Sequence, residues 1–257
     1  MFLLLTTVIA TQLQAQVGGV SNSKIVTLNC ATVEQSKLEF EPAFFVVKYS
    51  KFYNNNKLTN YFSTSDSVFT SAGMGFRFTY GLGSKTEIGV SIPSDISDIA
   101  VGLKYHVLSK GKYDAALIAG YNYNVPFGRS DKILHRYSSY VVGIINSFQI
   151  SDKLSVDTDI QIHGSQYLKG TPFDYNYFFN TDAGYYLTSG LQLCAGFSYS
   201  HQNSSSIIAA QALMFNPGIT IETGKNFVLI LSVPNTVWGK NTDKVYGFAF
   251  ALTTTFE

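Results

Sequence analysis

Between Phe76 and Leu108 the chain alternates apolar and polar residues in short runs that Gly, Ser, Pro and Asp separate. This period of two is typical of strands joined by turns. One face of each predicted strand is apolar throughout, and the other carries charged residues and glycines. Alternation alone fits two architectures, because a soluble sandwich buries its apolar face whereas a transmembrane barrel turns that face toward lipid.

The same pattern recurs along the chain and predicts about 12 strands. They cover approximately residues 38–49, 68–82, 86–93, 99–108, 113–125, 137–150, 154–163, 175–187, 191–199, 207–222, 227–233 and 244–256. Pro42 predicts a bulge or a late start in the first strand, since proline donates no ladder hydrogen bond. The sixth strand is less regular, because Val141 and Ile145 fall on its polar face.

The connections between the predicted strands alternate in length. Those after even-numbered strands are short, such as residues 81–85, whereas most of those after odd-numbered strands are longer, such as residues 51–66 and 234–243. Short periplasmic turns, longer outer loops and an even number of strands are typical of bacterial outer-membrane barrels. A soluble sandwich would not require this alternation.

Composition favours the barrel. Charged residues make up only 14% of the chain and apolar residues 46%, whereas soluble domains usually contain about 25% charged residues. A large part of the surface therefore does not face water. The net charge of +1 gives no reason to expect nucleic acid or a strongly acidic partner. After the first residues no run of 18 apolar residues occurs, so we predict an all-β, transmembrane, antiparallel up-and-down β-barrel over residues 37–257.

The first 36 residues do not fit the strand pattern. Residues 1–15 are apolar and then small and polar, which predicts a signal peptide cleaved after Ala15. Residues 16–36 are polar and patternless, and we interpret them as an N-terminal extension. One role open to this extension is to plug the lumen. Cys30 and Cys194 lack the spacing of a zinc or redox site, and we expect neither a disulfide nor a metal.

In a barrel, the polar face of each strand lines the lumen. The side chains that we expect there are Glu39, Glu41, Arg77, Glu87, Lys104, His106, Asn122, Asn124, Asp157, Asp159, Gln161, His163, Asp182 and Glu222. Arg77, Glu87 and Lys104 lie on three successive strands and predict a cross-strand network. Charges in a low-dielectric interior must be paired or hydrated, so these residues either fill and rigidify a narrow barrel or line a path for solutes.

The segment Arg77–Pro93 followed by residues 97–128 resembles the outer-membrane family labelled for the MetA pathway of phenol degradation. The resemblance rests on Tyr80 with Gly81, on Glu87 entering the next strand, and on the run Gly102–Tyr105. The chain departs from the family pattern at Pro126–Gly128 and before the fourth strand. The resemblance covers about a quarter of the chain and implies an outer-membrane barrel with a transport role and no catalytic residues.

A second resemblance suggests an enzyme. His163, Gly164 and Ser165 resemble the His-x-Ser of outer-membrane phospholipase A, also a barrel, with Asn176 as a candidate orienting amide. The residues after Ser165 differ from that enzyme, and the strand phase directs His163 into the lumen rather than toward lipid. We therefore expect a protein that is not an enzyme and needs no cofactor.

The sequence thus predicts a bacterial outer-membrane channel or transporter for small solutes, hydrophobic or aromatic ones among them. The competing interpretation is a structural or adhesion barrel with a plugged lumen. Expected partners are outer-membrane lipid, a small-molecule solute and the barrel-assembly machinery, because residues 244–256 are similar to the closing, assembly-signal strand of such barrels.

Overall fold

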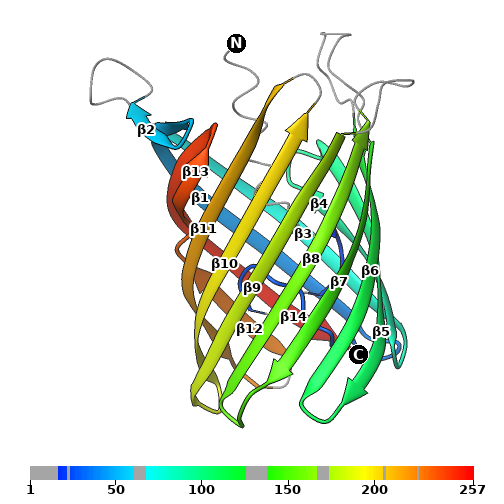
Figure 1. Ribbon diagram of the computed structural model, residues 1–257. Coiled ribbons are helices and arrows are strands. Elements are labelled where there is room, and N and C mark those ends of the chain that lie inside the picture. Colours follow the sequence, from blue (N-terminus) through cyan, green and yellow to red (C-terminus); the bar gives the residue numbers. More distant parts are fainter. Residues whose placement is uncertain are drawn as a thin grey trace.

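The computed structural model describes residues 17–21, 24–60, 68–125, 138–166, 174–204, 207–224 and 226–257. The predicted signal peptide and Pro126–Gly128 lie outside the described residues. The strands are β1 Leu38–Asn54, β2 Lys57–Asn60, β3 Phe69–Gly83, β4 Thr86–Pro93, β5 Asp98–Lys110, β6 Tyr113–Asn124, β7 Ser138–Gln149, β8 Leu154–Gln166, β9 Asp174–Thr188, β10 Leu191–Ser204, β11 Ile207–Glu222, β12 Phe227–Ser232, β13 Asn235–Lys240 and β14 Thr242–Phe256. All belong to one antiparallel sheet. It closes into a barrel because β1 pairs with β3 on one side and with β14 on the other (Figure 1).

The 14 strands occupy 12 positions in the barrel wall, as the alternation predicted. Strand β2 is a short extension that pairs only with the end of β1. Strands β12 and β13 share one position between β11 and β14, and Val233 and Pro234 separate them. The all-β barrel inferred from the sequence is therefore confirmed.

Three local predictions were wrong. The predicted long loop 51–66 instead contains the end of β1 and the strand β2. No register shift occurs at Pro42, which continues the β1–β3 ladder opposite Phe76, and the shift in β1 lies between Tyr49 and Lys51. Only the ladder with β14 is interrupted near Pro42, as the missing N–H of proline requires. The predicted long loop 234–243 instead contains β13, which joins β14 through Asn241, a residue with φ of 51°.

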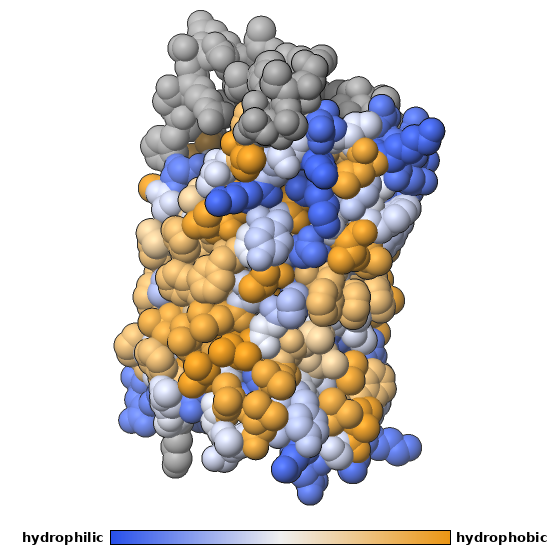
Figure 2. All heavy atoms as spheres, turned by 90° about the vertical axis from the view of Figure 1, so that its left-hand side faces the viewer, coloured by the Kyte–Doolittle hydropathy of each residue, from blue (hydrophilic) through white to orange (hydrophobic). Residues whose placement is uncertain are grey.

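The two faces of the sheet differ as the alternation predicted. Large apolar side chains such as Leu103, Leu117 and Ile160 are exposed on the outside, whereas Glu87, Lys104 and other charged side chains are buried inside. Figure 2 shows a broad hydrophobic belt on one side of the barrel, with hydrophilic residues toward both ends. A closed sheet with such a belt satisfies its backbone hydrogen bonds within lipid, so the chain is an outer-membrane barrel.

The short turns lie at the lower end of Figure 1, and the strand ends that flank the longer connections lie at the upper end. In outer-membrane barrels these are the periplasmic and the extracellular ends, respectively. No helix in the described part of the chain is long and apolar enough to cross a membrane.

Candidate functional site

Residues 17–21 and 24–36 lie inside the barrel, in the half nearer the periplasmic turns (Figure 1), and we call them the plug. One side of the plug is apolar. Its buried residues Val17, Val20, Leu28 and Cys30 form one cluster with wall residues Ala116, Ile118, Val141 and Ile145. The apolar residues that disturbed the polar face of the predicted sixth strand are thus the surface on which the plug packs.

The plug also lies against glycines of the wall. Gly89, Gly102 and Gly120 are directly paired across β4, β5 and β6. A Cβ added at Gly89 would come 1.7 Å from the carbonyl oxygen of Gly19, and one at Gly102 would come 2.3 Å from another plug carbonyl oxygen. Any side chain on this stripe would therefore displace plug residues 17–19.

Carboxylates of the wall accept hydrogen bonds from the plug backbone. Oδ2 of Asp182 accepts from the backbone N–H groups of Ile25, Val26 and Thr27 at 2.9, 2.8 and 2.9 Å. On the neighbouring strand β8, Oδ2 of Asp159 accepts from the N–H of Leu28 at 3.1 Å. Hydrogen bonds to an ionised acceptor are stronger than neutral ones, so these two side chains fix the central part of the plug.

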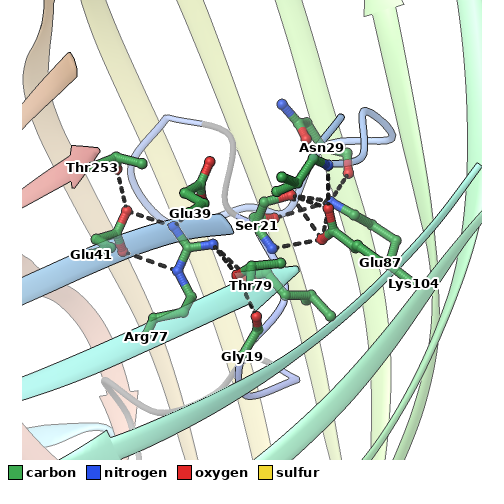
Figure 3. A network of polar contacts seen from close by, with 12 residues as sticks. Gly19, Ser21, Asn29, Glu39, Glu41, Arg77, Thr79, Glu87, Lys104 and Thr253 are labelled. Atoms are coloured by element: carbon green, nitrogen blue, oxygen red, sulfur yellow. Dashed lines mark hydrogen bonds and ion pairs between the residues drawn. The ribbon is translucent and has the colours of Figure 1, made fainter. Parts of the chain in front are cut away.

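Glu87 and Lys104 form a second attachment point, shown in Figure 3. The two side chains make an ion pair at 3.0 Å, and both are fully buried. The Glu87 carboxylate also accepts from the N–H groups of Ser21 and Val33, each at 2.7 Å. The Lys104 ammonium donates to the backbone carbonyls of Ser21 and Asn29, each at 3.1 Å. Each of the two charges therefore holds the plug at two separate places.

Arg77 belongs to a different group of charges from the one predicted. Its guanidinium pairs with Glu39 at 2.9 Å and with Glu41 at 2.7 Å, both on the neighbouring β1. It also donates to the carbonyl of Val20 at 2.9 Å. The expected three-strand network is thus two networks, and plug residues 19–21 connect them.

Other predicted lumen residues also contact the plug. Asp157 forms an ion pair with Lys24, and Oε1 of Gln161 accepts from the N–H of Val17 at 3.0 Å. Together with the residues above, seven predicted lumen side chains meet at the plug, namely Arg77, Glu87, Lys104, Asp157, Asp159, Gln161 and Asp182.

The remaining predicted residues lie elsewhere in the barrel. His106 is near the periplasmic rim, 3.2 Å from Asp114. Glu222 accepts from the hydroxyl of Tyr186 at 2.8 Å. Asn122 is half-buried on β6, and the side chain of Asn124 lies outside the described residues.

The hydrolase arrangement is not assembled. His163 faces the lumen, where its Nε2 lies 3.3 Å from Oε1 of Gln161 and its ring contacts Phe178. The amide oxygen of Asn176 accepts from the N–H of Asn203 at 3.0 Å. Within the described residues no hydrogen bond joins His163 to Ser165, so the geometry gives this alternative no support.

Cys30 and Cys194 are both buried and free. The Cys30 N–H donates to Oγ of Ser147 at 3.1 Å, and its thiol lies 3.5 Å from the carbonyl of Ile145. Burial raises the pKa of the Cys30 thiol, and a hydrogen bond with the Ser147 side chain acts in the opposite direction.

The sequence analysis missed Thr79, Ser147 and the glycine stripe as plug contacts. Oγ1 of Thr79 donates to the Gly19 carbonyl at 2.5 Å. The available signal was the combination of glycines and apolar residues on faces that should line a water-filled lumen.

Comparison with protein-family models gives no match, and no curated protein matches the chain. Solved structures do match. The COG4313 outer membrane channel from Pseudomonas putida F1 is 12% identical with a TM-score of 0.67, and the match covers 88% of this chain and 98% of that one. The NanC porin is 9% identical with a TM-score of 0.52, covering 84% of this chain and 99% of that chain.

The KdgM porin in complex with disordered oligogalacturonate is 11% identical with a TM-score of 0.50, and the match covers 82% of this chain and 99% of that one. At these identities the likeness establishes the fold alone. The chain therefore shares the barrel fold of outer-membrane channels and porins, while its resemblance to the MetA-pathway family stays a prediction.

Proposed function

We propose that this barrel is an outer-membrane channel for small solutes, that the plug closes it in the present conformation, and that solutes pass when the plug leaves the lumen. The observation that carries the proposal is the chemistry of the plug's attachment. Arg77, Glu87, Lys104, Asp159 and Asp182 hold the plug through hydrogen bonds to its backbone. Water can replace each of these bonds, whereas the barrel itself is closed by the separate β1–β14 ladder.

The excess of negative charge on the lumen wall indicates that the channel would favour polar or cationic solutes. Around the plug the wall carries the carboxylates of Glu39, Glu41, Glu87, Asp157, Asp159 and Asp182 against the cations of Arg77 and Lys104. Lys24, which offsets part of this excess, belongs to the plug and would leave with it. An opened lumen would therefore be acidic and would favour cations and neutral polar molecules. The hydrophobic or aromatic solutes expected from the sequence fit this wall less well.

A permanently plugged structural barrel is the second candidate. The complete burial of Glu87 and Lys104 favours it, because releasing the plug would require both charges to be hydrated again. The two candidates differ in whether a lumen without the plug conducts ions.

The test compares two proteins in planar lipid bilayers under a salt gradient. The mature chain is the protein without the predicted signal peptide, and the shortened variant also lacks residues 17–36. Our proposal expects brief openings from the mature chain and a steady conductance from the shortened chain, with a reversal potential that indicates cation preference. Heat-modifiable migration of the shortened chain would show that its barrel has folded. A folded, shortened barrel that does not conduct would overturn the channel and leave the structural barrel.

A further inference from the structure

Lysines gather on the outer surface at the extracellular end of β1 and β14. Lys48 alternates along β1 with the buried residues Val47 and Tyr49, so its side chain points outward. Its partner across the ladder is Tyr246, which is 57% exposed on the outer surface. Lys48 therefore lies on the face that meets the membrane.

The next cross-strand pair consists of two lysines. After the bulge in β1, Lys51 pairs directly with Lys244 of β14. Residues directly opposite in an antiparallel ladder have Cβ atoms about 5 Å apart, and like charges placed so destabilise the sheet. Lys57 of β2 and Lys240 of β13 lie at the same end of the barrel. We call Lys48, Lys51, Lys57, Lys240 and Lys244 the lysine patch.

No acidic residue in the described part of the chain forms an ion pair with the lysine patch. The carboxylate nearest in sequence, Asp243, is buried, with only 4% of its surface exposed. The Lys244 ammonium donates to neutral oxygens, namely the side chain of Asn235 at 2.8 Å and the carbonyl of Thr236. These contacts orient Lys244 but leave its positive charge uncompensated. An anion from outside the chain could therefore bind at the patch.

The surroundings of the patch indicate which anion fits. Trp238, the single tryptophan of the chain, is 37% exposed beside Lys240, and such aromatic residues mark the level of lipid headgroups. Figure 2 shows this side of the barrel, where hydrophilic residues interrupt the hydrophobic surface near its upper end. An anion bound there would sit at headgroup level with its apolar part along the belt below.

We propose that the lysine patch binds the phosphate groups of an acylated, phosphorylated glycolipid of the outer leaflet. The ammonium groups contact the phosphates, and the acyl chains lie along the apolar belt next to the patch. The five lysines come from two separate segments, residues 48–57 and 240–244, which is why no single basic segment stands out in the sequence. The inference does not depend on whether the plug moves.

The test uses lipid A as the glycolipid probe and native mass spectrometry of the folded, detergent-solubilised barrel. We expect the wild-type chain to retain lipid A and the triple variant Lys48→Gln/Lys51→Gln/Lys244→Gln to lose apparent affinity by at least about tenfold, since each lysine near an anionic headgroup contributes measurably. The matched control, Lys85→Gln/Lys110→Gln/Lys153→Gln, removes three exposed lysines from the periplasmic turns and should bind as the wild type does.

Two further arms identify the source of the phosphate. Lipid A stripped of its phosphates should bind weakly to the wild type and equally weakly to the triple variant. Inorganic phosphate in excess should leave most of the lipid bound, because it lacks acyl chains. Unchanged lipid A binding by the folded triple variant, equal binding of the stripped lipid, or complete displacement by inorganic phosphate would each overturn the proposal.

Discussion

Glu87 is the residue at which the wall, the plug and a buried cation meet. Its carboxylate pairs with Lys104 of β5 and accepts from two plug N–H groups. Its acidic position at the start of β4 and its inward phase could be predicted from the sequence. Its plug partners Ser21 and Val33 could not, because the plug has no periodic pattern and is positioned only by tertiary contacts.

Replacing Glu87 should be costly. Glu87→Ala would leave Lys104 buried without its counterion, and breaking a buried pair in this way costs about 3–5 kcal/mol. We expect a lower free energy of unfolding in lipid vesicles and faster proteolysis within residues 17–36. In the control Glu87→Ala/Lys104→Ala both charges are absent, and part of the stability should return. Equal stability of Glu87→Ala and the wild type would contradict this account of the pair.

At the scale of elements, the plug fits the wall through residues that strand patterning treats as irregularities. Val141 and Ile145 lie on the lumen face and pack against the plug, and the stripe of Gly89, Gly102 and Gly120 leaves room for the plug backbone. The positions of the main strands could be predicted from alternation because each of them has one lipid-facing side, although β1, β8 and β10 extend further than predicted. Strand β13 could not be predicted in this way. Its short sequence, Asn235–Lys240, has the composition of a polar loop and forms a strand only because it pairs with β11 and β14.

A single methyl group on the glycine stripe should displace the plug. Gly102→Ala would place a Cβ 2.3 Å from the Gly18 carbonyl oxygen and 2.6 Å from the Val17 side chain, so residues 17–20 of the plug must move away. We expect more frequent openings in planar bilayers with an unchanged barrel. The matched control is Gly83→Ala, whose added Cβ would meet nothing within 4 Å. If the two variants conducted alike, the plug would not be held against this stripe in the membrane.

At the scale of the molecule, the barrel has the opposite arrangement to a soluble β-sheet protein. Its apolar residues lie on the outside, and its charged residues lie in the interior around the plug. The chain's low charge, alternating connections and period of two predict this arrangement because lipid on one side and polar contacts on the other constrain every strand. The position of the plug in the lumen depends on contacts between segments that are distant in the sequence, such as the hydrogen bond from Ile25 to Asp182. No local pattern encodes those contacts.

The lipid-facing surface can be tested directly. Ile160 is 48% exposed in the middle of β8, so Ile160→Arg would place a charge in the hydrocarbon region. A charge at the bilayer midplane costs about 2–4 kcal/mol in outer-membrane barrels. We expect that loss in the free energy of unfolding from vesicles, and about zero for the neutral replacement Ile160→Leu. An arginine tolerated without loss would place this face in water.

The central claim is that ions pass only when the plug leaves the lumen, and a tether between Cys30 and β7 tests it most directly. Ser147→Cys places a second thiol where the Ser147 hydroxyl now contacts Cys30. In planar bilayers the reduced variant should show conductance steps that disappear after oxidation and return with reductant. The control Cys30→Ser/Ser147→Cys retains Cys194 but cannot form the tether, so its conductance should not change when the oxidant is added. Undiminished conductance from barrels whose tether is shown to be closed would contradict the account.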